Sequence, residues 1–276
     1  MSGAAAHRHY RRPGLAGDIL AALALAPSDA PLDPATLAAL DHFHVGGAAA
    51  TRRLAGHARL APGEHVLDLG SGLGGPARLL AGVFGARVTG LDLSADFCAA
   101  AACLGRMTGL DGRVAIVCGD AVRLPFGDGV FDVVWTEHTA MNIAGRAALY
   151  AECARVLRPG GRLALYDIVR AGGGPDEFLY PVPWARGPEA SHLLTAAELR
   201  ATLRAAGLAE RVWIDESAGA RDWLVAATQP RPGAAPPPKA TLRLVMGPDF
   251  PQMIANLRDN FVAGRTGAVQ AVFAKA

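Results

Sequence analysis

The stretch VLDLGSGLGGPAR, residues 66–78, joins an apolar run to a turn with four glycines among six residues. Residues 64–70 have the apolar character of a buried β-strand, and Gly75 to Phe84 that of a helix. Gly70, Gly72 and Gly75 fit the spacing G-x-G-x-x-G, which lets a ligand approach backbone N–H groups where a helix starts. The stretch therefore predicts a strand–turn–helix unit that binds a nucleotide-like ligand.

Strand-like and helix-like segments alternate from this stretch onward. Further strands are predicted at 86–93, 113–120, 130–137, 162–169 and 211–217, and further helices at 95–107, 146–157 and 195–207. The motif RPGG at 158–161 predicts a stop between helix and strand. This alternation predicts an α/β fold with a doubly wound, mostly parallel sheet and right-handed crossovers.

Polar residues recur where the predicted strands end. They are Asp68, Asp92, Asp120, and Glu137 with His138. The carboxyl ends of parallel strands lie at one edge of a sheet, and ligands of such sheets bind there. We therefore expect these side chains to converge on one crevice.

The identity of the ligand depends on Asp68. Asp92, which follows Gly72 by 20 residues, occupies the place of a ribose-binding acid in a dinucleotide fold as well. A carboxylate one turn from the glycines would repel a pyrophosphate, whereas it would attract the ammonium of S-adenosylmethionine, which has no phosphate. S-adenosylmethionine is therefore the predicted cofactor, and a nicotinamide-dependent oxidoreductase remains an alternative.

The composition of the 276 residues suits a single large domain, since 51% are hydrophobic. The net charge is +2, with arginines interspersed among acids, which gives no argument for a nucleic-acid partner. The four cysteines lack zinc spacing, and no metal is expected.

Near the start, Leu15, Ile19 and Leu23 predict an amphipathic helix rather than a signal or membrane segment, and a cytoplasmic location is expected.

The block from Glu64 to Val169 resembles the class I S-adenosylmethionine-dependent methyltransferases. It contains VLDLGSGLGG, VTGLDLS, GDAVRLPFGDGVFDVVW and RVLRPGGRLALYD in the order of that family. Within the small-molecule branch, LDHFHVGGAAATRRLA (40–55) and WTEHTAMNI (135–143) resemble bacterial relatives of the sarcosine/dimethylglycine N-methyltransferases. Ubiquinone/menaquinone and tocopherol C-methyltransferases belong to the same branch.

This resemblance implies a seven-stranded Rossmann-like sheet with an antiparallel last strand. The expected layout is an N-terminal helical cover (1–45), a core (46–217) with a substrate loop (170–193), a helical insertion with a proline-rich link (218–266), and the last strand (267–276). In the core, the resemblance implies that Gly70, Ser71, Gly72 and Gly74 hold the methionine part of the cofactor. It also implies that Asp92 binds the ribose, Leu93 flanks the adenine, and Asp120 with the backbone of Ala121 meets the adenine amino group.

Methyl transfer also needs an acceptor site and can use a base that titrates near neutral pH. His138 and then His44 are the catalytic candidates, and Asn142, Tyr166, Tyr180 and Trp184 are the substrate-binding candidates. On resemblance alone, the expected acceptor is a small amine of the sarcosine/dimethylglycine kind. Carbon or oxygen methylation of a quinone, prenyl or other secondary metabolite is the alternative, and a non-catalytic cofactor-binding protein is another.

Overall fold

The computed structural model describes residues 10–25, 31–171, 177–229 and 240–275. Five parts of the sequence-based expectations lie outside these residues. They are residues 1–9 and 26–30 of the N-terminal cover, 172–176 of the substrate loop, 230–239 of the proline-rich link and residue 276 of the last strand.

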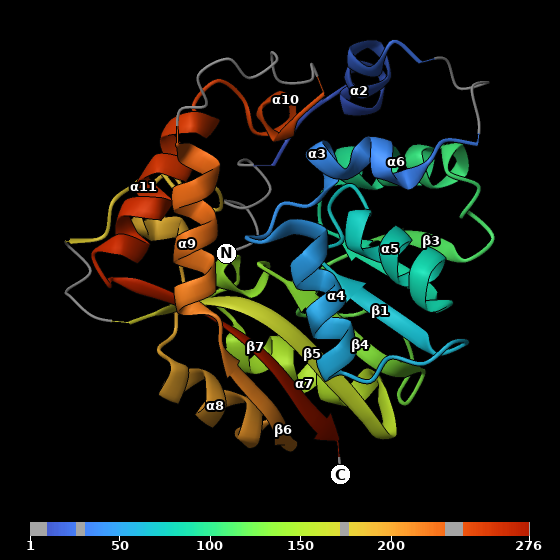
Figure 1. Ribbon diagram of the computed structural model, residues 1–276. Helices are drawn as coiled ribbons and strands as arrows, with labels where there is room; N and C mark the ends of the chain where they lie inside the picture. Colours follow the sequence, from blue (N-terminus) through green and yellow to red (C-terminus); the bar gives the residue numbers. More distant parts are fainter. Residues whose placement is uncertain (1–9, 26–30, 172–176, 230–239, 276) are drawn as a thin grey trace.

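Seven strands form one sheet in the order β3-β2-β1-β4-β5-β7-β6 (Figure 1). The strands are β1 (His65–Leu69), β2 (Arg87–Asp92), β3 (Val114–Cys118), β4 (Phe131–Glu137), β5 (Leu157–Arg170), β6 (Leu208–Asp215) and β7 (Thr266–Lys275). The first five strands pair in parallel, and β7 runs antiparallel to both β5 and β6. The predicted fold class is confirmed, including the antiparallel last strand.

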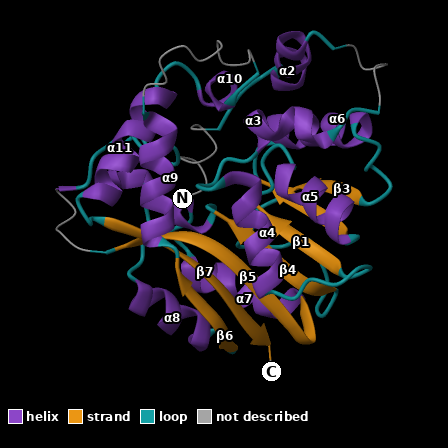
Figure 2. Cartoon of the chain, viewed as in Figure 1, coloured by secondary structure: helices purple, strands orange, loops and turns teal. Residues whose placement is uncertain are grey.

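Helices cover both faces of the sheet (Figure 2). They are α2 (Leu15–Leu23), α3 (Ala38–Asp41), α4 (Gly47–His57), α5 (Gly75–Phe84), α6 (Ala95–Met107), α7 (Arg146–Val156), α8 (Ala196–Ala205), α9 (Ser217–Thr228), α10 (Leu242–Met246) and α11 (Phe250–Val262). Short 3-10 turns occur at Pro34–Leu37, Ala140–Asn142 and Pro188–Ala190. Alternate strand residues face opposite sides of the sheet. Val66 belongs to an apolar cluster that includes residues of α4, α5, α9 and α11, whereas Leu67 belongs to one that includes residues of α7 and α8.

A third apolar cluster joins the N-terminal segment to α6. Leu15 and Ile19 of α2 are buried against Phe97 and Leu104, which confirms the predicted amphipathic helix. The segment is also tied to the insertion, because Nε of Arg12 donates a hydrogen bond to the carbonyl of Val245 in α10 at 2.8 Å. Residues from both ends of the chain therefore meet above the sheet. No helix among the described residues is long and apolar enough to cross a membrane.

Two predicted strands have different boundaries. The strand predicted at 162–169 extends over 157–170, because Leu157 already pairs with Phe131 and the RPGG residues form a break in register before Arg162 pairs with Val133. The strand predicted at 211–217 covers 208–215, since its pairing with β7 starts at Leu208. In both cases, hydrogen-bonded pairing with the neighbouring strand determines where the strand begins and ends.

Candidate active site

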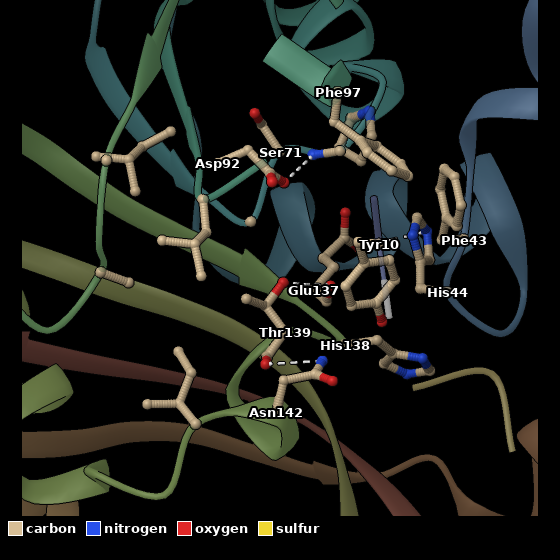
Figure 3. A pocket seen from close by; sticks show the side chains of 18 of the residues that line it. Tyr10, Phe43, His44, Ser71, Asp92, Phe97, Glu137, His138, Thr139 and Asn142 are labelled. Carbon is tan, nitrogen blue, oxygen red and sulfur yellow. Dashed lines mark hydrogen bonds and ion pairs between the residues drawn. The ribbon is translucent and has the colours of Figure 1, made fainter. Parts of the chain in front are cut away.

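A cavity with about 1090 Å³ of empty volume opens at the carboxyl ends of β1, β2 and β4 (Figure 3). The glycine turn after β1 forms part of its wall. The backbone N–H groups of Gly70 and Ser71 donate to the carbonyl of Leu91, at 2.8 and 3.1 Å. The turn is thus anchored to the end of β2.

Gly70 and Gly75 are required by close packing. Gly70 has φ of 70°, and a β-carbon there would lie 2.3 Å from the side chain of Thr139. A β-carbon at Gly75 would lie 2.3 Å from the backbone oxygen of Asp41, which ends α3. The glycines therefore let two other segments approach the turn and close the cavity.

Asp92 holds the turn from the end of β2. Its Oδ2 accepts a hydrogen bond from the N–H of Gly72 at 2.9 Å, and its Oδ1 accepts one from the N–H of Ser94 at 2.9 Å. Burial raises the pKa of Asp92, and these hydrogen bonds oppose that rise. A carboxylate oxygen can accept more than one hydrogen bond, so Asp92 retains capacity for ligand hydroxyls.

The charged side chains that line this cavity are all acidic. They are Asp41, Asp92, Asp120 and Glu137, and no Arg or Lys is among the described residues in the lining. Such a lining suits a cationic ligand and disfavours a pyrophosphate, which needs N–H groups and positive charge around it.

Glu137 belongs to a buried hydrogen-bonded group at the end of β4. Its Oε2 accepts hydrogen bonds from Oγ1 of Thr51 at 3.0 Å and from Nε1 of Trp135 at 3.1 Å. Its Oε1 has no hydrogen-bond partner and lies 3.6 Å from Nε2 of His44. Burial raises the pKa of Glu137 to about 7, against the effect of the two hydrogen bonds.

Asp68 lies beneath the turn and is not part of the cavity lining. It is buried, its Oδ2 has no partner, and burial together with Glu137 and Asp92 raises the pKa of Asp68 well above its usual range. Two buried carboxyl groups, Asp68 and Glu137, thus each have an unpartnered oxygen. Such atoms are costly unless a cation or donor reaches them, and the ammonium and sulfonium of S-adenosylmethionine fit that requirement.

The two candidate histidines differ in their surroundings. Nε2 of His44 lies 2.9 Å from the carbonyl of Gly47 and 3.1 Å from Oγ1 of Thr51, so this nitrogen is already engaged. Nε2 of His138 is buried without a partner. Burial lowers the pKa of His44 to about 4 and that of His138 well below its usual range, which leaves both rings neutral at pH 7.

His138 also has an unusual backbone conformation, with φ of 48°. Its ring packs against that of Tyr166, with ring centroids 4.5 Å apart. The N–H of His138 donates to the carbonyl of Tyr166 at 2.8 Å. β5 therefore holds this histidine in place, and Tyr166 contacts the histidine without lining the cavity.

A second cavity, with about 890 Å³ of empty volume, adjoins the first. Tyr10, Phe43, His44 and His138 line both cavities. In Figure 3, His44 lies beside the Tyr10 ring and His138 lies below it. These four residues mark the junction of the two cavities.

Most of the sequence-predicted residues come together at these cavities. The predicted residues that line the first cavity are His44, Gly70, Ser71, Gly72, Asp92, Leu93, Asp120, Ala121, Glu137, His138 and Asn142. Trp184 lines the second cavity. Asp68, Gly74, Tyr166 and Tyr180 line neither, and Tyr180 packs on Phe178 with ring centroids 5.0 Å apart.

Ten further residues line the first cavity and were not singled out from the sequence: Tyr10, Asp41, Phe43, Pro76, Leu91, Phe97, Gly119, Val122, Thr139 and Ile143. Asp41 forms a buried ion pair with Arg78 at 2.6 Å, across 37 positions of sequence. No local pattern signals such a pair. Phe43 had a signal in its position next to His44, which was already a catalytic candidate.

Similarity to known proteins covers the central part of the chain. Residues 67–165 match the model of the family described as "Methyltransferase domain". Over 140 residues the chain is 38% identical to the methyltransferase GfsG of Streptomyces halstedii, which covers 51% of this chain and 49% of that protein. It is 33% identical over 124 residues to a sarcosine/dimethylglycine N-methyltransferase of Halorhodospira halochloris, and this match covers 45% of this chain and 44% of that protein. It is 37% identical over 153 residues to the O-methyltransferase cnsE of Penicillium expansum, covering 54% of each.

The matched part thus spans about half the length of these curated relatives. Solved structures match over more of the chain. The [4+2]-cyclase SpnF is 26% identical with a TM-score of 0.65, covering 95% of this chain and 94% of that one. A geranyl diphosphate methyltransferase in complex with GPP and sinefungin has a TM-score of 0.69 at 19% identity, and the match covers 100% of this chain and 99% of that one. At this identity the match shows similarity of fold alone.

Proposed function

We propose that this chain, whose residues 67–165 match the methyltransferase domain family, transfers a methyl group from S-adenosylmethionine to a small-molecule acceptor. The observation that carries the proposal is the charge of the first cavity, whose lining has four acidic residues and, among the described residues, no Arg or Lys. A phosphate-free cationic nucleoside suits this lining, and a nicotinamide dinucleotide does not.

Each part of the cofactor has a matching group in the chain. The glycine turn, which lines the cavity at Gly70, Ser71 and Gly72, would contact the methionine part of the cofactor, and Glu137 would attract its ammonium. Asp92 would accept hydrogen bonds from the ribose hydroxyls. Leu93, Asp120 and Ala121, at the far end of the lining, would flank the adenine.

When bound, the cofactor supplies a methyl group on a positively charged sulfur. The chain must hold the acceptor in line with that methyl group, at about 3 to 3.5 Å. His138 lines both cavities, and its Nε2, which has no hydrogen-bond partner, would accept a proton from the acceptor. His44, whose Nε2 is already engaged, would serve to position neighbouring groups.

The acceptor atom is open between nitrogen, carbon and oxygen. A sarcosine-like amine is the expectation from sequence resemblance, and a relative with that activity in its name matches this chain. A relative named as an O-methyltransferase matches to a similar extent. The choice between these acceptors therefore depends on the second cavity.

A second candidate function is cyclisation without methyl transfer. It is favoured by the similarity to the [4+2]-cyclase SpnF, which extends over 95% of this chain. The two functions differ in the fate of a labelled methyl group, because a cyclase leaves the label on the cofactor.

Calorimetric titration tests the proposal directly. We expect the purified chain to bind S-adenosylmethionine and S-adenosylhomocysteine saturably and to show no binding of NAD or NADPH. Binding of a nicotinamide nucleotide in place of S-adenosylmethionine would overturn the proposal. A screen of acceptors with methyl-labelled cofactor, read by product mass, then separates methyl transfer from cyclisation.

A further inference from the structure

The second cavity is built almost entirely from parts of the chain outside the matched methyltransferase region. Of its lining residues, only His138 and Met141 lie within residues 67–165. The others come from the segment before α4, from the loop after β5, and from α9, α10 and α11. The names of the relatives therefore carry little information about this cavity, and its own chemistry must identify the ligand.

The lining of this cavity carries no charge at neutral pH. Among the described residues that form it there is no Asp, Glu, Lys or Arg. Its titratable side chains are three histidines and a tyrosine. Burial lowers the pKa of His42 and His44 to about 4 and that of His138 well below its usual range, and it raises the pKa of Tyr10 above its usual value. A carboxylate or phosphate placed here would be buried without a partner, which is unfavourable.

Aromatic and sulfur-containing side chains supply much of the surface. Phe43, Trp184, Trp223 and Phe250 contribute rings, and Met141 and Met246 contribute thioethers. Nε1 of Trp184 donates a hydrogen bond to Oγ of Ser191 at 3.0 Å, so the polar atom of this ring is already engaged. Trp223 is 43% exposed, which leaves the cavity an edge near the surface. A lining that is mostly apolar and aromatic, with few polar groups, is typical of sites for small molecules.

One polar atom at the junction needs a donor. Nε2 of His138 is buried and unpartnered, and in the tautomer protonated on Nδ1 it is a hydrogen-bond acceptor. A ligand hydroxyl would satisfy this nitrogen while the rest of the ligand contacts the apolar wall.

Resting on the function proposed above, we infer that the acceptor is an uncharged, largely apolar ring compound whose hydroxyl group is methylated beside His138. The acceptor oxygen forms a bond to the methyl carbon as the carbon–sulfur bond breaks. The electron pair of that bond remains on sulfur, and the hydroxyl proton moves to Nε2 of His138. The positive charge lost by sulfur is thereby gained by the imidazole, so the net charge of the site is unchanged.

Equilibrium dialysis in the presence of S-adenosylhomocysteine tests this acceptor class by binding as well as by activity. The neutral probes are radiolabelled 17β-estradiol and 1-naphthol, and the charged probes are sarcosine and dimethylglycine. We expect saturable binding of at least one neutral probe and none of the charged ones. With labelled S-adenosylmethionine, the bound phenol should become a methyl ether.

Two tryptophan variants locate the binding. Trp223→Ala should weaken binding of the neutral probe at least fivefold, whereas Trp213→Ala should leave it within twofold, because Trp213 lies on β6 outside both cavities. Saturable binding of sarcosine, or no saturable binding of either neutral probe, overturns the inference. Titration with S-adenosylmethionine is measured separately, so loss of cofactor binding would instead count against the proposed function.

Discussion

Oδ2 of Asp92 accepts a hydrogen bond from the backbone N–H of Gly72 at 2.9 Å, so the acid that ends β2 holds the turn that follows β1. Gly70 and Ser71 add to this link by donating to the carbonyl of Leu91. The same carboxylate faces the first cavity. Asp92 therefore connects the shape of the glycine turn with the binding of a ligand's sugar.

Replacing Asp92 should weaken cofactor binding strongly. Asp92→Ala leaves the N–H groups of Gly72 and Ser94, and the two ribose hydroxyls, without their acceptor, at about 1–3 kcal/mol for each buried group. We expect the Kd for S-adenosylmethionine to rise at least tenfold by calorimetry. Asp111→Ala, at an exposed acid outside the cavity, is the control and should not change the Kd. Equal Kd values for the two variants would contradict the role of Asp92 in cofactor binding.

Cofactor affinity should increase with pH. The pKa of Glu137 is about 7, so below that pH the group is neutral, and above it a carboxylate faces the bound cation. Binding between pH 6 and pH 8 should therefore release a proton, and the Kd should fall by up to about tenfold for each pH unit. The pKa of His44 is about 4, which places its titration outside this window.

Two glutamine variants assign that dependence on pH. Glu137→Gln should flatten the plot of Kd against pH, since the amide does not titrate but can still accept hydrogen bonds from Thr51 and Trp135. Glu189→Gln, at an exposed position, should keep the slope of the parent chain. A slope that survives in Glu137→Gln would assign the proton to another group.

Gly70→Ala should destabilise the fold more than an equivalent change elsewhere. Its β-carbon would meet Thr139 at 2.3 Å, whereas at Gly63, with φ of 82°, nothing lies within 4 Å. Both variants carry a similar backbone cost of about 1 kcal/mol, and only Gly70→Ala adds overpacking, worth about 1–3 kcal/mol. Urea unfolding measures the difference, and equal losses of stability in the two variants would refute the close approach.

His138→Asn should remove proton transfer while retaining cofactor binding. Asparagine tolerates the positive φ of this position and can form hydrogen bonds, but it cannot act as a base near neutral pH. With an accepted substrate, we expect kcat to fall about 10²–10⁴-fold and the Kd for S-adenosylmethionine to stay within threefold. His57→Gln on α4, outside both cavities, controls for loss of a histidine. A merely structural role would instead raise the Kd and lower stability.

The strand ends illustrate how far local patterns reach. The glycine spacing after β1 predicted the turn, and the acids after β1 to β4 predicted one crevice, because parallel strands bring their carboxyl ends to one edge. The limits of β5 and β6 were predicted less well. Leu157 joins β5 through its pairing with Phe131, and Leu208 joins β6 through its pairing with Lys275. Those partners are distant in sequence.

The sequence by itself determined the sheet, the glycine turn and three of the four acids that line the first cavity, Asp92, Asp120 and Glu137, because periodicity and turn chemistry act between residues close along the chain. Only the tertiary structure decided which residues surround the acceptor. Tyr10, Trp223 and Leu257 line one cavity although they belong to opposite ends of the chain. Their meeting depends on the packing of α2, α3, α10 and α11 above the sheet, which no local pattern encodes.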